Sequence, residues 1–184
     1  MPWDDARFDR FVEALTRLCR GELAGYGYPQ VILPYPPSEE MACIEAVRAL
    51  PNRLHGVGIA CDVVPVAPSV AGALKRHAGR ILEDQDDYRR LEAGLSEPVN
   101  GLVGRTVEVL APELTAKQAD GRLIVLCRLG ALYPFGHVSA LLDQLYRKGV
   151  RNMGVVYPGT AEGTSLKFLG RLDPTGAYRG HIVT

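Results

Sequence analysis

The feature that most constrains the fold is an unbroken apolar run in the second half of the chain. Residues 123–127 read Leu-Ile-Val-Leu-Cys, with no polar side chain among them. Successive side chains of a strand point to opposite faces, so such a run indicates a strand that is covered on both faces. A strand of that type belongs in the middle of a parallel sheet that lies between two layers of helices.

Apolar residues at helical spacing alternate with short apolar runs along the rest of the chain. The runs predict further strands at residues 31–33, 58–66, 152–157 and 178–183, the last of them at a sheet edge. Helical spacing predicts helices that begin near Asp4 or Asp5, Ser38, Pro68, Ser96 and Val138. This alternation indicates an α/β fold: a single three-layer domain over residues 1–184, with a mostly parallel sheet flanked by helices.

The second predicted helix can be described in more detail. Ser38 is a favourable N-cap, and Glu39 and Glu40 then fall in the first turn, where the helix dipole favours acidic side chains. Pro51 is expected to end the helix. The face that we expect to be buried comprises Met41, Ile44, Val47 and Leu50.

The balance of charges limits the classes of partner. Lys and Arg number 21, Asp and Glu also number 21, and the formal net charge is zero. No global field therefore attracts the protein to DNA or to anionic lipid, and we expect no direct, specific binding of nucleic acid. No apolar run approaches the roughly 18–20 residues that span a bilayer, and the acidic N-terminus is unlike a secretory signal. We expect a cytoplasmic protein that does not bind membranes.

No motif predicts a metal, a cofactor or a reaction. The four cysteines are widely spaced, and the four histidines supply no paired ligands, so the cysteines are expected to be buried small apolar residues. The chain has no G-x-S-x-G or H-E-x-x-H motif. Catalytic triads can assemble from distant residues, so this absence weakens an enzymatic interpretation without excluding it. We expect a protein that is not an enzyme and that carries no cofactor.

Three predicted loops should lie where open parallel sheets bind ligands, beyond the carboxyl ends of the strands. They are Pro34–Glu40, Arg128–His137 and Pro158–Ser165. The third loop contains Gly159 and Gly163 and could cradle a phosphate through its backbone N–H groups. Thr164, however, occupies the position of the P-loop lysine. The alternative is that both glycines serve a tight turn.

Several side chains in these loops have two interpretations each. Glu39 is either an acid or metal ligand, or a favourable charge at a helix N-terminus. Arg128 could bind an anion or a partner's carboxylate, or could pair with Glu39, Glu40 or Glu162. Arg128 is also a candidate for a docking surface, provided that the first and third strands are neighbours. The alternative is that Tyr133 and Phe135 simply cover the end of the sheet. The aromatic candidates for that surface are Tyr35, Tyr133 and Phe135.

A more specific pattern occupies the last part of the chain. Its motifs, in order, are Tyr157-Pro158-Gly159, Glu162-Gly163, Leu166, Phe168-Leu169-Gly170 and Tyr178-Arg179. In this order and spacing they resemble the BrxB family of bacteriophage-exclusion (BREX) defence proteins. Tyr35-x-Pro37-x-Glu39 fits a matching element in the N-terminal half.

This resemblance implies a function that the residues alone do not. The operons of the family also encode a large ATPase, a DNA methyltransferase and a PglZ phosphatase-like protein. The resemblance implies a non-enzymatic accessory or adaptor that contacts other proteins of the defence operon, foremost the PglZ-like protein. The resemblance assigns no catalytic residues to this chain. The alternative is a small nucleotide- or phosphate-binding α/β protein, such as a degenerate NTPase-like domain.

Overall fold

The computed structural model describes residues 4–23, 30–78, 92–97, 101–163, 165–169 and 180–184. Its strands form a six-stranded sheet with the order β2-β3-β4-β1-β6, and β5 pairs with β4. The strands are β1 (Gln30–Tyr35), β2 (Cys61–Pro65), β3 (Leu123–Cys127), β4 (Met153–Glu162), β5 (Ser165–Phe168) and β6 (His181–Ile182). All pairs are parallel except β4 with β5. The prediction of an α/β fold with a mostly parallel sheet is confirmed.

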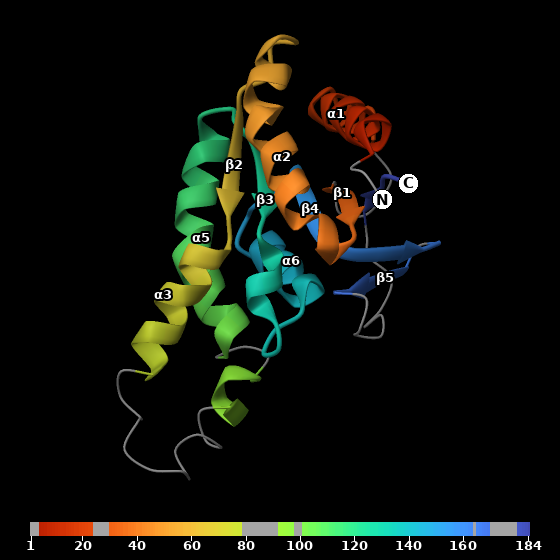
Figure 1. Ribbon diagram of the computed structural model, residues 1–184. Coiled ribbons are helices and arrows are strands. Elements are labelled where there is room, and N and C mark those ends of the chain that lie inside the picture. The colour runs from red at the N-terminus through yellow and green to blue at the C-terminus, as the bar shows by residue number, and fades with distance from the viewer. Residues whose placement is uncertain (1–3, 24–29, 79–91, 98–100, 164, 170–179) are drawn as a thin grey trace.

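Helices cover both faces of this sheet (Figure 1). One face carries α1 (Asp5–Cys19) and α2 (Glu40–His55). The other carries α3 (Ala67–Ala78), α5 (Leu102–Ala119) and α6 (Val138–Arg147). Short 3-10 helices η1 (Pro37–Glu39) and η2 (Leu129–Leu132) follow β1 and β3. None of the helices in the described part of the chain is long and apolar enough to cross a membrane.

The central apolar run lies where its sequence predicts. In β3, Val125 packs into the core beneath α1 and α2, whereas Ile124 and Leu126 pack into the core on the opposite face. All three side chains are 0% exposed. The alternation of faces explains why every position of this strand is apolar.

The first helix also follows its sequence pattern. Asp4 is the N-cap, and its carboxylate accepts a hydrogen bond from the Arg7 backbone N–H at 3.1 Å. This bond satisfies one of the N–H groups that a helix N-terminus leaves without a partner in the helix. The apolar stripe of α1 is buried against the sheet, and it comprises Phe8, Phe11, Ala14, Leu15 and Leu18.

The structure of helix α2 differs from three of the predictions made from the sequence. The helix begins at Glu40 after the 3-10 turn η1, so Ser38 is not its N-cap. Met41 is 70% exposed and does not belong to the buried face. Pro51 lies inside the helix, which continues to His55. Proline removes one backbone hydrogen bond, but complete burial of Leu54 holds the final turn on the sheet. The buried residues of α2 are Cys43, Val47, Leu50 and Leu54.

The ends of other elements differ from their predicted positions. Helix α5 begins at Leu102 rather than near Ser96. Strand β4 continues to Glu162, beyond the predicted end at residue 157. Strand β6 lies at the sheet edge, as predicted, and its neighbour is β1. Residues 178 and 179 of the predicted last strand lie outside the described residues.

Candidate functional site

The first two predicted loops follow β1 and β3, whose carboxyl ends lie at one end of the sheet, and the third begins within β4 at the same end. Strand β4 lies between the other two, so the first and third strands of the chain are not neighbours. The condition for a shared surface of Tyr35 and the residues after β3 is therefore not met.

Tyr35 is a core residue. It is 1% exposed and packs beneath α1 and α2. Its hydroxyl donates a hydrogen bond to the Glu40 carboxylate. Burial, and then this hydrogen bond, raises the pKa of Tyr35 well above its usual value, so the hydroxyl stays protonated. The prediction that Tyr35 contributes to a docking surface is wrong.

Glu39 holds the start of α2 close to α1. Its carboxylate lies 3.7 Å from a guanidinium nitrogen of Arg7, and its side chain is 12% exposed. The carboxylate oxygen in this ion pair is buried and makes no hydrogen bond with a described residue, so the ion pair with Arg7 is the polar contact observed for it. This geometry favours the structural interpretation of Glu39.

Arg128 adopts the left-handed conformation, with φ 57° and ψ 40°, between β3 and η2. It is exposed and makes no ion pair with any described residue. The expected partners are engaged elsewhere: Glu39 with Arg7, Glu40 with Tyr35 and Glu162 with Lys167. The prediction that Arg128 pairs with Glu39, Glu40 or Glu162 is wrong, and no other acid among the described residues pairs with it.

The two aromatic residues after β3 have different environments. Tyr133 is 43% exposed, whereas Phe135 is partly buried and packs against the core beneath α3, α5 and α6. Phe135 therefore covers the end of the sheet, and Tyr133 is accessible to a partner. Phe135 and Tyr35 also pack on opposite faces of the sheet.

The predicted phosphate loop is a β-hairpin. Gly159 lies in β4 opposite Phe168 of β5, and Gly163, with φ +63°, lies at the turn. A Cβ on Gly159 would lie 2.1 Å from the Lys167 carbonyl oxygen, so close strand pairing requires glycine there. No helix follows the turn among the described residues of this segment, and the N-terminal anion site that the phosphate alternative needed is not formed. Only Gly163 serves the turn; the prediction for Gly159 is corrected to a strand position.

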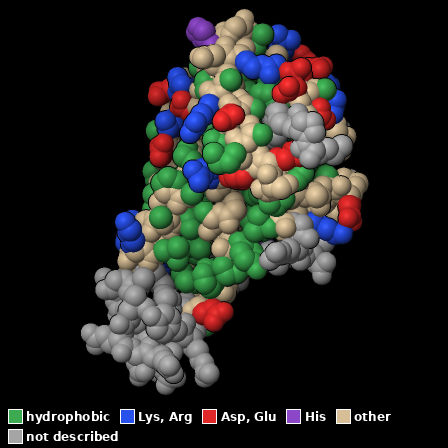
Figure 2. Space-filling view, viewed as in Figure 1, with side chains coloured by type: hydrophobic (Ala, Val, Ile, Leu, Met, Phe, Trp, Pro, Cys, Tyr) green, Lys and Arg blue, Asp and Glu red, His purple; other side chains and the backbone are tan. Residues whose placement is uncertain are grey.

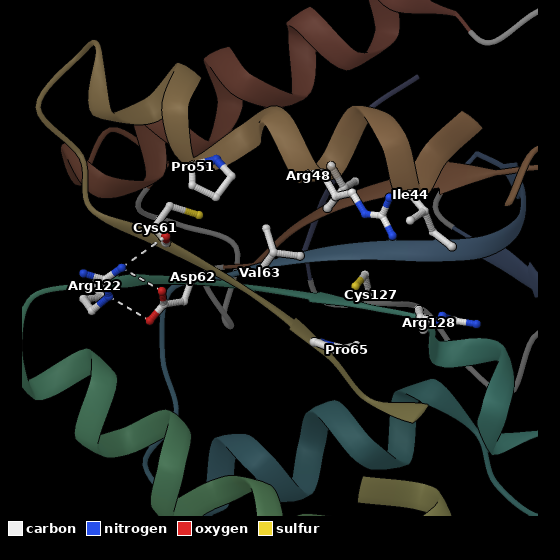
Figure 3. A pocket seen from close by; sticks show the side chains of 11 residues that line it. Ile44, Arg48, Pro51, Cys61, Asp62, Val63, Pro65, Arg122, Cys127 and Arg128 are labelled. Carbon is white, nitrogen blue, oxygen red and sulfur yellow. Dashed lines mark hydrogen bonds and ion pairs between the residues drawn. The ribbon is translucent and has the colours of Figure 1, made fainter. Parts of the chain in front are cut away.

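A cavity that the sequence did not predict opens between α2 and the edge strand β2 (Figure 3). Its volume is about 540 Å³. Alternate residues of β2 form its floor, because Cys61, Val63 and Pro65 point toward α2. The residues of α2 that line it are Ile44, Val47, Arg48 and Pro51.

A charged cluster closes the end of this cavity that is nearest the start of β3. The Arg122 guanidinium donates to both carboxylate oxygens of Asp62, at 2.7 Å and 2.6 Å, and Lys117 donates to the same carboxylate at 3.2 Å. The hydrogen bond from Arg122, followed by the contribution of Lys117, lowers the pKa of Asp62. Asp62 interrupts an otherwise apolar strand.

Two thiols in the cavity wall are poor nucleophiles. Burial is the main cause that raises the pKa of Cys127 to about 11 and that of Cys61 to about 12. Both thiols are therefore protonated near neutral pH, and thiolate chemistry does not account for the cavity.

Comparison with known proteins agrees with the pattern in the last part of the chain. The sequence model of a family described as BREX protein BrxB matches residues 80–182. This range includes α5, β3, α6 and the β4–β5 hairpin, whereas Tyr35, Pro37 and Glu39 precede it. Searches of curated proteins and of solved structures returned no match. Because the matched range is more than half of the chain, the protein belongs to the BrxB family and is a component of a BREX anti-phage defence system.

Proposed function

We propose that this protein is a non-enzymatic accessory of its BREX system and that it docks another protein of that system, foremost the PglZ-like protein. The observation that carries the proposal is the exposure of two large apolar side chains at the carboxyl end of the sheet. Met41 is 70% exposed in the first turn of α2, which follows β1, and Tyr133 is 43% exposed after β3. We call Met41 and Tyr133, together with Arg128, the docking residues; because β4 lies between β1 and β3, we propose that the partner spans this end of the sheet and does not bind one contiguous patch.

The types of these residues fit protein recognition. Tyrosine, methionine and arginine are enriched in the cores of protein interfaces, and tyrosine and arginine often dominate the binding energy. Figure 2 shows apolar side chains gathered in the lower half of one face and charged side chains in its upper half. The zero net charge offers no long-range attraction, so contact area must supply the affinity.

Four of the described groups that could do chemistry are paired or have a raised pKa. The Tyr35 hydroxyl and the Glu40 carboxylate bind one another, and the Cys61 and Cys127 thiols are protonated. The hairpin at Gly163 removes the loop on which the nucleotide-binding alternative depended. These observations support docking over catalysis as the role of the protein.

Co-purification from a strain that carries the native operon tests the proposal. A tagged wild-type protein should retain the PglZ-like protein, and the double variant Met41→Ser, Tyr133→Ser should retain at least tenfold less. Val57→Ser is a matched control, because Val57 is 51% exposed but follows α2 at the opposite end of the sheet.

Each result has a defined meaning once circular dichroism shows that the variants are folded. Absence of any stable partner for the wild-type protein would contradict docking itself. Undiminished capture by the double variant would contradict the assignment of the docking residues. A loss with Val57→Ser as large as that with the double variant would place the interface at the other end of the sheet.

A further inference from the structure

The cavity between α2 and β2 combines an apolar lining with available positive charge. The apolar side chains that face it are those of Ile44, Val47, Pro51, Val63 and Pro65. Arg48 projects from α2, and Arg128 lies just past the end of β3 (Figure 3). Both are exposed, and neither makes an ion pair within the described ranges of the chain.

The two ends of the cavity differ in charge. Arg122 precedes β3 and is neutralised by Asp62, whereas Arg128 follows β3 and lies at the opposite end. Figure 3 shows the Arg122–Asp62 pair at one end and Arg48 with Arg128 at the other. The excess positive charge therefore lies at one mouth of an apolar space, at the carboxyl end of β3. This is the end of a parallel sheet at which ligands are usually bound.

We propose that this cavity binds a small organic anion that carries a carboxylate or phosphate group on an apolar body. The planar guanidinium groups of Arg48 and Arg128 would bind the anionic group, because arginine matches both carboxylate and phosphate geometry. The apolar body would lie over Val63 and beneath Ile44. A volume of about 540 Å³ falls in the range of ligand sites, which are mostly apolar with a few polar groups that orient the ligand.

The edge of β2 argues against an extended peptide as the occupant. The Val66 N–H bonds the Cys127 carbonyl, and the Leu123 N–H bonds the Ala60 carbonyl. Even-numbered residues of this strand therefore direct their backbone groups toward β3, and residues 61, 63 and 65 direct theirs outward.

Two features block that outer edge. Pro65 has no N–H to donate, and a guanidinium nitrogen of Arg122 lies 3.4 Å from the Cys61 carbonyl oxygen and donates to it. Proline and charged side chains are the devices by which edge strands avoid pairing with another chain. A compact anion therefore fits the cavity better than a strand of a partner protein does. This inference does not depend on the docking function, because it needs no second protein.

Titration of the isotope-labelled full-length protein with octanoate tests the inference by NMR. Octanoate should bind saturably, with amide shifts centred on α2 and on residues 61–65. Octyl phosphate should produce the same map, whereas octanol, which lacks the charge, should bind at least tenfold more weakly. Inorganic phosphate, which lacks the apolar body, should also bind at least tenfold more weakly.

Three variants distinguish the contribution of the arginine charges to octanoate binding from the contribution of the cavity volume. Arg48→Gln with Arg128→Gln should weaken octanoate binding at least tenfold. Val63→Phe keeps both arginines but fills the cavity, and should abolish binding. Arg147→Gln removes an exposed arginine from the end of α6 and should leave the affinity unchanged.

Several outcomes would overturn the inference. They are a linear, unsaturated response to octanoate, shifts centred on another part of the chain, and equal affinity for octanol. Unchanged affinity for octanoate in the variant Arg48→Gln with Arg128→Gln would also overturn the inference. If octanoate does not bind while Val63→Phe abolishes capture of the PglZ-like protein, the cavity holds a segment of that partner, and the small-anion inference is wrong. Because octanoate binding is measured on the protein alone, its result stands whether or not docking is confirmed.

Discussion

At the scale of single residues, Arg128 combines three unusual features. It is exposed, it makes no ion pair with a described residue, and it occupies a left-handed conformation with φ 57°. Residues other than glycine, asparagine and aspartate rarely adopt this conformation, which costs about 1 kcal/mol or more. An arginine in that place favours a role in binding over a role in stability.

The left-handed backbone at Arg128 predicts a difference in stability between two substitutions at this position. Arg128→Gly should be more stable than Arg128→Ala by about 1 kcal/mol, because glycine alone adopts a positive φ without strain. The difference corresponds to roughly 2–4 °C in Tm for a chain of this size. Thermal unfolding of the two variants measures it. A Tm for the glycine variant at or below that of the alanine variant would contradict the strain.

Because the pKa of Asp62 is lowered in the folded protein, we expect the stability of the fold to depend on pH. The folded-state pKa of Asp62 is lowered by Arg122 and Lys117, so its contribution is present above the ordinary aspartate pKa of about 3.9 and is lost as pH falls through the lower folded-state value. At pH 7, Asp62→Asn should therefore have a lower Tm than the wild type. The gap should close as the pH is lowered below about 3.9. A gap that stays constant from pH 7 to acid pH would show that the charge of Asp62 does not stabilise the fold.

At the scale of elements, the β4–β5 hairpin is the clearest case of a paired, partly buried segment that the sequence suggested was a loop. Phe168 is 3% exposed, and its ring centroid lies 5.8 Å from that of Tyr157. Leu166, 1% exposed, packs into the same core as both rings. The hairpin is thus held to the sheet by buried side chains in addition to its strand pairing.

Removal of the Phe168 ring should be costly. Phe168→Ala should lower the free energy of unfolding by about 3–5 kcal/mol, because it deletes a buried aromatic ring and leaves a cavity. Thr160→Ala, an exposed substitution in the same hairpin, should cost less than about 1 kcal/mol. Urea denaturation of both variants provides the comparison. If the two losses are equal, Phe168 is not part of the core.

Local patterns predicted the elements well where periodicity was strong. The apolar run of β3 and the stripe of α1 are local signals, and both were confirmed. The hairpin was missed because Pro158 and Gly159 are typical of turns. Gly159 is instead required by the carbonyl of Lys167 across the pair, which is a contact between strands.

Local patterns in the sequence also fail to show contacts between distant elements at the candidate site. Tyr35 could be judged buried or exposed only after α1 and α2 were placed over β1. The cavity depends on the position of β2 at the sheet edge, which follows from strand order and not from any local motif. Arg48 gave no signal in the sequence, because an exposed arginine on a helix is ordinary.

At the scale of the whole molecule, zero net charge predicts weak binding to DNA. The isolated protein should bind duplex DNA with a Kd of roughly 10⁻⁴ M or weaker at physiological salt, the level of non-specific contacts. A mobility-shift titration measures this. A tight shift that persists as salt is raised would contradict the prediction and would indicate direct recognition of DNA.

The most direct test of the central claim, that the protein acts by docking through residues at the carboxyl end of the sheet, is phage resistance in a strain with the intact operon. Plating efficiency should be compared for wild type, a deletion of this protein, Met41→Ser with Tyr133→Ser, and Val57→Ser. We expect the double variant, present at normal abundance, to lose resistance to the level of the deletion, and Val57→Ser to remain fully resistant. Full resistance in the double variant would contradict the central claim.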